Sequence, residues 1–317
     1  MRFIKLLIVL AFMAALGMYY FVYVMSGQAT TYFVNHERKA AKLVRHEITL
    51  PDGMHYVYLD GGHGEPLILL HGFGADKDSF TRVAKHLTEH YHVIIPDLLG
   101  FGESSHPLNV DYSSRAQAER VRALAQALDI TSVHLGGNSM GGQIALSYAA
   151  AHPAEVQSLW LLDPAGIWSA PQSELAKVLD RDHRNPLIVR NEDDYVHAME
   201  YAMSKPPYIP KPILHVMAQT SIKNVALSER IFLQISNDSI ESKIKGLKTP
   251  TLIIWGDQDR VIHVLTAEVL YNLLPKSKVN IMKGIGHMPM LENPEECAND
   301  YEFFRFRLIT EEKNAAK

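Results

Sequence analysis

Gly137-Asn138-Ser139-Met140-Gly141 stands between a short apolar run that ends at Gly136 and an apolar helical pattern over residues 143–151. This order of strand, sharp turn and helix is typical of a bend that presents a serine hydroxyl at the end of a strand. Such a bend strains the backbone at the serine, and the glycines two positions before and after it let the helix pass close to the strand. The pattern therefore predicts a nucleophilic serine, Ser139. The competing interpretation is an ordinary glycine-rich loop.

The rest of the chain alternates short apolar runs with helical patterns. Helical periodicity places Val83 with Leu87 on one apolar face and Val121 with Leu124 on another. A last helix is expected to begin with Asn293 as its cap. This alternation predicts an α/β protein with a mostly parallel, doubly wound sheet. The expected strands lie at residues 55–59, 67–70, 93–96, 132–136, 158–162, 251–255 and 278–282.

Residues 6–25 are apolar or aromatic throughout and carry no charge. As a helix rising about 1.5 Å per residue, this run would measure roughly 30 Å, the thickness of the hydrocarbon core of a bilayer. We expect an uncleaved, single-pass N-terminal transmembrane helix, and therefore a membrane protein. A cleavable signal peptide is the alternative, although its apolar region is usually only about 7 to 15 residues long.

The charges around this segment do not orient it. Arg2 and Lys5 precede the run, and several basic residues follow it at the edge of the region in which such charges count. The charge rule therefore leaves the side of the membrane open. The basic residues that follow are Arg38, Lys39, Lys42 and Arg45.

The alternation of strands and helices is interrupted between residues 165 and 248 by helical segments and a proline-rich stretch. We expect a helical cap, or lid, inserted here after strand 6 of the sheet. The predicted organisation is a membrane anchor and juxtamembrane segment at residues 1–45, a core at residues 46–164 and 249–317, and a cap at residues 165–248. Residues 26–45 are largely polar and are expected to form a juxtamembrane helix or a linker.

Composition narrows the classes of partner. The 317 residues carry a formal net charge of -4 and no sustained basic run, so nucleic acid is not an expected partner. Cys297 is the only cysteine, which excludes an internal disulfide. We expect neither a metal nor a cofactor. His86-Leu87-Thr88-Glu89-His90 has the spacing of a zinc-binding helix, but no third ligand suggests itself, and a solvated helix end is favoured.

A serine hydroxyl needs a base within hydrogen-bond reach and a third group that orients the base. On sheets of this kind the acid follows the serine in the chain and the histidine follows the acid. His287 lies in a glycine-containing loop after the last expected strand, which makes it the candidate base. Asp259 is the preferred acid, because Asp257 is closer to its strand and is expected to shape the turn. Asp163, after an earlier strand, remains a third candidate.

The segment His71-Gly72-Phe73-Gly74 directly follows the expected strand at residues 67–70. This is the place at which such sheets form part of an oxyanion hole. The backbone N–H groups of Phe73 and Met140 are the candidate donors. A plain turn is the alternative, since the glycines fit one equally well.

From residue 62 to residue 306 the chain resembles the α/β-hydrolase family. The resemblance rests on five motifs that occur in the family's order: residues 71–74, 97–104, 137–142, 255–259 and 286–287. It is similar to the membrane-anchored monoacylglycerol lipases and related bacterial lipases, which pair an N-terminal span with Gly-x-Ser-Met-Gly-Gly-Gln, here residues 137–143, and Pro-Ala-Gly, here residues 164–166. The resemblance implies Asp259 rather than Asp163 as the acid, and Phe73 and Met140 as oxyanion donors.

The resemblance also implies a serine hydrolase that cleaves carboxylic esters of lipids, such as monoacylglycerol or a related acylglycerol. Two alternatives share this fold: carbon-carbon bond hydrolases of the meta-cleavage type, and lipid-binding proteins without turnover. The cap offers adaptable apolar side chains that are expected to line a channel for an acyl chain, although they would serve equally well as cap core. They are Met199, Tyr201, Met203, Tyr208, Ile213 and Met217.

Overall fold

An eight-stranded sheet of order β1-β2-β4-β3-β5-β6-β7-β8 forms the centre of the molecule. The computed structural model describes residues 2–315, so residues 1 and 316–317 of the predicted segments lie outside the described part. Strands β1 and β2, and β2 and β4, pair antiparallel, whereas every later pair is parallel. The predicted mostly parallel α/β sheet is confirmed. The strands are β1 Leu43–Thr49, β2 His55–Gly62, β3 Glu65–Leu70, β4 Tyr91–Pro96, β5 Val133–Asn138, β6 Val156–Leu162, β7 Thr251–Gly256 and β8 Ser277–Met282.

The seven strands expected from the sequence all overlap observed strands, but β1 was not predicted. Most of its side chains are exposed, because it lies at the edge of the sheet and pairs only with β2. Its sequence therefore has no apolar alternation that would reveal a strand. The sheet begins at Leu43, a few residues before the core boundary expected at residue 46.

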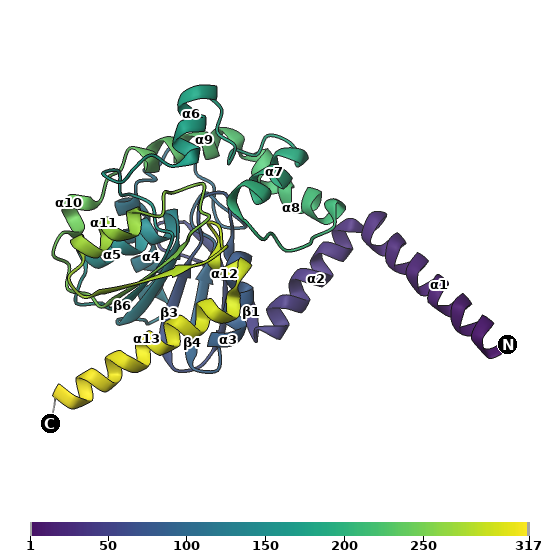
Figure 1. The fold of residues 1–317 in the computed structure, drawn as a ribbon, viewed down its shortest axis with the longest axis horizontal. Coiled ribbons are helices and arrows are strands. Elements are labelled where there is room, and N and C mark those ends of the chain that lie inside the picture. Colours follow the sequence, from purple (N-terminus) through teal and green to yellow (C-terminus); the bar gives the residue numbers. More distant parts are fainter. Residues whose placement is uncertain (1, 316–317) are drawn as a thin grey trace.

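Helices cover both faces of the sheet and bury two apolar clusters (Figure 1). One cluster includes Val121 of α4 and Ile144 of α5, and the other includes Val83 of α3 and Tyr301 of α13. Both faces are therefore apolar, which explains the nearly continuous apolar runs of the central strands. The helices of this core are η1 Lys77–Phe80, α3 Thr81–Leu87, α4 Ser114–Ala127, α5 Met140–Ala151, α11 Thr266–Leu273, α12 Pro289–Glu292 and α13 Pro294–Ala315.

Between β6 and β7 the chain forms five helices. The first four lie above the sheet in Figure 1, and the last packs against the core helix α5. Residues 203–210 connect two of these helices and carry the exposed side chain of Tyr208, and the proline-rich stretch, residues 205–212, continues from them into the first turn of the next helix. The helices are α6 Glu174–Asp182, α7 Glu192–Ala202, α8 Lys211–Lys223, α9 Val225–Ser236 and α10 Glu241–Ile244.

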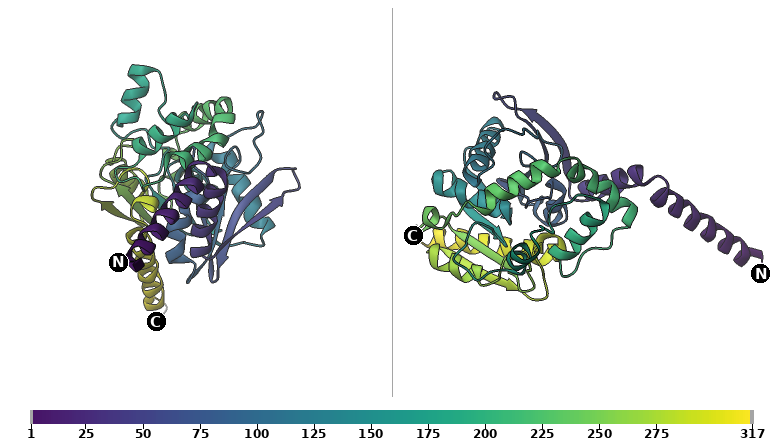
Figure 2. Two further views of the ribbon diagram at one scale, coloured as in Figure 1. Left: turned by 90° about the vertical axis from the view of Figure 1, so that its right-hand side faces the viewer. Right: turned by 90° about the horizontal axis from the view of Figure 1, so that it is seen from above.

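Two further helices precede the sheet. Helix α1, Arg2–Tyr23, projects away from the rest of the chain in Figure 1 and in the right view of Figure 2, and it is long and apolar enough to cross a membrane. Helix α2, Ser26–Ala40, turns back and packs on the body, where Ala29 is fully buried. Two ion pairs hold α2 in place: Arg38 with Asp78 at 2.5 Å, and Glu37 with Arg82 at 2.7 Å.

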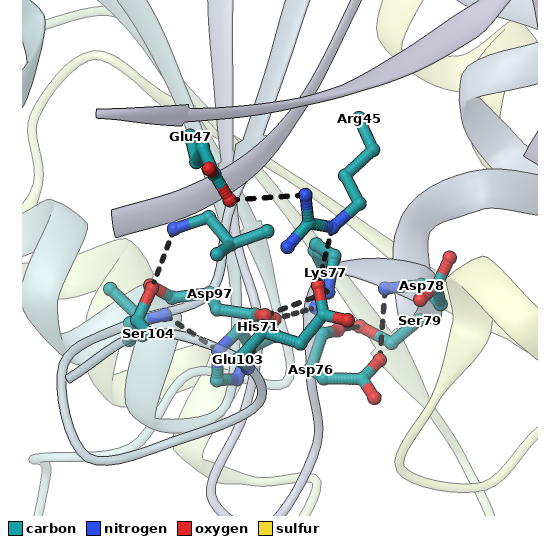
Figure 3. Close-up of polar contacts among 12 residues, drawn as sticks. Arg45, Glu47, His71, Asp76, Lys77, Asp78, Ser79, Asp97, Glu103 and Ser104 are labelled. Carbon is teal, nitrogen blue, oxygen red and sulfur yellow. Dashed lines mark hydrogen bonds and ion pairs between the residues drawn. The ribbon is translucent and has the colours of Figure 1, made fainter. Parts of the chain in front are cut away.

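A buried ion pair anchors the segment that follows β3 to the loop that follows β4 (Figure 3). Lys77 Nζ lies 2.7 Å from Asp97 Oδ2, and both side chains are almost fully buried. Asp97 also accepts the backbone N–H groups of Lys77 and Glu103, each at 2.8 Å. Arg45 of β1 extends the network, because its Nε donates to Glu103 at 2.7 Å. These bonds satisfy the buried carboxylate and fix two loops of the sheet.

We predict that Lys77→Met destabilises the fold by about 3 kcal/mol, because it leaves a buried carboxylate without its counter-charge. Urea unfolding of the full chain measures the effect. Lys243→Met is the matched control, since Lys243 is 47% exposed in its pair with Asp238 and such pairs contribute little. Equal stability of the two variants would show that Lys77 does not stabilise Asp97.

Candidate active site

Ser139 occupies the bend between β5 and α5, at φ 54° and ψ −118°. A positive φ is costly for a residue with a side chain, so the surroundings must hold it. A Cβ on Gly137 would lie 2.4 Å from the carbonyl oxygen of Gly141, and one on Gly141 would lie 2.0 Å from that of Leu70. The two glycines are therefore required for helix and strand to approach each other behind Ser139.

The loop after β8 brings His287 to the same end of the sheet. His287 Nδ1 lies 2.8 Å from Asp259 Oδ2, and its backbone N–H donates to Ala202 O at 2.7 Å. The side-chain amide of Asn138 donates to the backbone carbonyl of His287 at 2.9 Å. The residue directly before Ser139 is therefore hydrogen-bonded to His287, although the two lie far apart in the sequence.

Asp259 is arranged as an acceptor. Its side chain is fully buried, and its Oδ1 accepts the backbone N–H groups of Val261 and Ile262 at 2.7 and 3.0 Å. Oδ2 is left for His287, whose Nδ1 therefore acts as the donor. With the proton on Nδ1, Nε2 of the neutral imidazole is the nitrogen that can accept a proton.

The other two candidate acids lie close by. Asp257 Oδ1 accepts the backbone N–H of Gly284 at 2.6 Å, so this carboxylate joins its loop to the loop after β8, whereas it was expected to shape its own turn. Asp163, Asp259 and His287 each place one side-chain atom within 4.8 Å of the others. Asp163 is fully buried, and its burial, followed by the charge of Asp259, raises its pKa well above the ordinary value.

The loop after β3 lies against the bend. A Cβ on Gly72 would be 3.2 Å from Ser139 Cβ, which places this backbone beside the serine. Met140 is the first residue of α5, where an N–H has no partner inside the helix. Among residues 2–315, neither Phe73 N nor Met140 N donates to a backbone acceptor outside a helix or strand. Both N–H groups are thus available to an oxygen bound near Ser139.

His71 supports this loop from behind. Its Nδ1 donates to Gly72 O at 2.8 Å, and its Nε2 accepts the backbone N–H of Leu98 at 2.9 Å. One nitrogen donates and the other accepts, which describes a neutral ring. Burial lowers the pKa of His71 and thereby favours that neutral form.

An apolar cavity of about 350 Å³ lies beside the site. It is lined by Phe73 from the loop after β3, by Met288 next to His287, and by helices α7 and α8. Four of the side chains expected in a channel line it: Met199, Tyr208, Ile213 and Met217.

Tyr201 and Met203 are not among the residues that line this cavity. Helix α7 turns Tyr195, Met199 and Ala202 toward the cavity, and Tyr201 falls on a different side of the same helix. The ring of Tyr201 instead lies 4.9 Å from the guanidinium of Arg260, and Met203 is buried in the core. The lining of the cavity therefore does not support the expected contact of Tyr201 and Met203 with the substrate.

One wall of the cavity was not predicted from the sequence. Thr30, Phe33 and Val34 of helix α2 line it, although residues 26–45 were expected to be a juxtamembrane helix or linker outside the core. The sequence pattern that could have indicated this contact is weak, because only small residues such as Ala29 and Thr30 are buried on this helix. Alanine and threonine on an otherwise polar helix do not indicate an apolar contact.

His86 and His90 belong to no cluster of potential metal ligands among residues 2–315. Helix α3 ends at Leu87, and His90 faces Glu302 at 3.8 Å. Within the described residues, the group close enough to share an ion consists of Asp163, Asp259 and His287, two of which are hydrogen-bonded to each other.

The chain is similar to known proteins over most of its length. A family model described as "alpha/beta hydrolase fold" matches residues 65–294, which include Ser139, Asp259 and His287. "Lipase 1" of Psychrobacter immobilis is 44% identical over 284 residues, 87% of this chain and 88% of that protein. "Monoacylglycerol lipase ABHD6" of Mus musculus is 30% identical over 249 residues, 75% of this chain and 74% of that protein. The crystal structure of "a membrane phospholipase A, a novel bacterial virulence factor" is 39% identical, with a TM-score of 0.85, over 96% of this chain and 98% of that one.

The approach of β7 to the histidine loop leads to a prediction. A Cβ on Gly256 would lie 2.0 Å from Gly286 O, so Gly256→Ala must push the loop away from the strand. We expect a loss of about 2 kcal/mol, as for other overpacked sites, measured as a lower melting temperature. Gly27→Ala is the control, because a Cβ there meets no atom within 4 Å. Unchanged melting of Gly256→Ala would refute the close approach.

Proposed function

The chain belongs to the α/β-hydrolase family, and we propose that it is a serine hydrolase that cleaves carboxylic esters of lipids, acylglycerols among them. The observation that carries this proposal is the hydrogen bond between His287 and Asp259, in a loop that is itself bonded to Asn138 beside Ser139. Three chemical roles are thereby available at one end of the sheet: nucleophile, base and orienting acid.

The proposed reaction proceeds through an acyl-enzyme. His287 Nε2 takes the proton of the Ser139 hydroxyl, whose oxygen attacks the ester carbonyl carbon. The imidazolium then protonates the leaving alcohol, and water, activated by the same nitrogen, releases the fatty acid. Asp259 stabilises the imidazolium and keeps the Nδ1 proton in place. The backbone N–H groups of Phe73 and Met140 bind the oxyanion, each worth about 3 kcal/mol of barrier.

Three observations support a lipid ester as the substrate. The relatives include a bacterial lipase, and others are named as a monoacylglycerol lipase and a membrane phospholipase A. The cavity beside the site is apolar and of a size that accommodates a small ligand or part of an acyl chain. Helix α1 has the length and composition of a membrane span. An ester that partitions into a bilayer matches all three features.

We further propose that α1 is an uncleaved anchor and that residues 165–248 act as the cap of the site. Tyr19, Tyr20 and Tyr23 lie at the end of α1 nearest the body, where aromatic rings favour the membrane interface. Ion pairs between α2 and residues 78 and 82 hold the body next to this end. The catalytic residues would thus stay close to lipid.

The first test of this function is Ser139→Ala in the full chain. We expect it to lower the hydrolysis of medium-chain monoacylglycerol and nitrophenyl esters by at least about a thousandfold, because the variant lacks the hydroxyl that attacks the ester carbonyl. Ser169→Ala, at an exposed position, is the control and should retain activity. Thermal melting of both variants confirms that they are folded.

Different outcomes separate the alternatives. Turnover of vinylogous diketones with little ester hydrolysis would favour a carbon-carbon bond hydrolase. Failure of a fluorophosphonate probe to label Ser139 would favour a lipid-binding protein. Equal ester hydrolysis by Ser139→Ala would refute the assignment of the nucleophile.

A second test concerns the cavity. Ile213 of α8 lines it and is 5% exposed, so Ile213→Trp should fill the space that an acyl chain occupies. We expect the ratio of long-chain to short-chain ester turnover to fall by about tenfold, as steric changes in apolar pockets commonly give. Leu233→Trp, at a position 63% exposed on α9, should leave the ratio unchanged. A parallel loss for all chain lengths would argue against an acyl channel.

A further inference from the structure

Asp163 is a buried carboxyl group that the proposed reaction does not use. It follows β6 directly, its side chain is fully buried, and its φ of 46° is in the region that side chains disfavour. Its Oδ1 accepts the backbone N–H of Gly256 at 2.9 Å. Its Oδ2 is also buried and meets no donor among the described residues. A carboxyl held in this way requires an explanation.

Asp163 lies next to Asp259: one side-chain oxygen of each aspartate and one ring nitrogen of His287 all lie within 4.8 Å of one another. A hydrogen bond between two neighbouring carboxyl groups requires a proton on one of them. Two carboxylates side by side in a buried site also do not both ionise, because neither is solvated and their charges repel. One of the two aspartates is therefore a neutral acid.

The distribution of donors shows which one holds the proton. Asp259 accepts two backbone N–H groups and the Nδ1–H of His287, all of which stabilise a carboxylate. Asp163 accepts only the N–H of Gly256, on Oδ1. The neutral acid is thus Asp163, and the proton sits on Oδ2, the atom that otherwise lacks a partner.

We propose that Asp163 is a positioning residue of the active site, whose protonated Oδ2 donates a hydrogen bond to the Asp259 carboxylate and so forms a chain from Asp163 through Asp259 to His287. This inference rests on the proposed serine hydrolase function. Asp259 then has donors on both sides, which fixes the plane of its carboxylate. It also shares its negative charge with Asp163, which limits how strongly it holds the imidazolium.

The groups that face Asp163 agree with a neutral acid there. Burial raises the pKa of Asp163 most, and the charges of Asp259 and, more weakly, Glu292 of α12 raise it further. On α13, the thiol of Cys297 is fully buried, and burial raises its pKa well above the ordinary value, so this neighbour carries no charge either. His287 is the third member of the group, and its Nδ1 is bonded to Asp259.

The test compares Asp163→Asn with Asp163→Leu in the pH profile of kcat/KM. Asparagine keeps a neutral donor toward Asp259, so we expect kcat within about threefold of wild type and an unchanged acid limb. Leucine removes the donor, so we expect kcat to fall about tenfold or more with little change in KM. Its acid limb should move to higher pH, because a more basic Asp259 stabilises the imidazolium more strongly.

Two results would overturn the proposal. An acid limb that moves to lower pH in Asp163→Asn would mean that wild-type Asp163 is ionised, since the variant then removes a negative charge near His287. A folded Asp163→Leu with the wild-type pH profile would reduce Asp163 to a structural role. Asp257→Asn is the matched control on a neighbouring loop and should keep the wild-type profile, because it bonds Gly284 instead.

The proton resonance of His287 Nδ1–H provides a readout that needs no substrate. In the full-length protein we expect this resonance to be unchanged in Asp163→Asn and shifted in Asp163→Leu. If the wild-type protein cleaves no ester, the proposed function fails, while this resonance still decides whether Asp163 donates to Asp259. If esters are cleaved and the resonance is the same in all three proteins, only the role of Asp163 is refuted.

Discussion

The positive φ of Ser139 is the constraint on which the candidate site depends. A residue with a side chain is held there only if its surroundings outweigh a cost of about 1 to 3 kcal/mol. Here β5 hydrogen-bonds to strands on both sides, α5 is buried along most of its length, and the backbone of Ser139 bonds to Leu162 and Ala165. Because the bend is fixed on both sides, the Ser139 hydroxyl has a defined position, and loops from other strands can be placed around it.

Hydrogen bonds to backbone groups are the main interactions that position those loops around Ser139. Asn138 binds the carbonyl of His287, His71 binds both Gly72 and Leu98, and Gly256 approaches Gly286 so closely that no side chain fits between them. Short polar bonds and missing side chains set distances more sharply than apolar packing does, because their geometry is directional. The region around Ser139 is correspondingly rich in glycine and buried polar groups. The apolar clusters on the two faces of the sheet support this region from behind.

The fold was predictable because its signals are local. The bend around Ser139, the apolar strands and the break at residues 165–248 are each visible within a short window of sequence, and the α/β fold is confirmed. Strand β1 was not predicted, because an exposed edge strand lacks an apolar pattern. The contribution of α2 to the cavity could not be predicted, because it depends on which way Thr30 and Phe33 face after folding. Likewise, the sequence presents Asp163, Asp257 and Asp259 as competing acids, whereas folding gives each a different hydrogen-bond partner.

Helix α2 links two properties that the sequence presents as separate. It continues the chain from the apolar helix α1, and it also forms part of the wall of the cavity next to Phe73. Its ion pairs run to Asp78 and Arg82, which belong to the same segment after β3 as Phe73 and the buried Lys77. A displacement of α2 would therefore change both the cavity and the support of the loop that carries a candidate oxyanion donor. The placement of the apolar helix α1 and the shape of the cavity beside the candidate site are for this reason physically coupled.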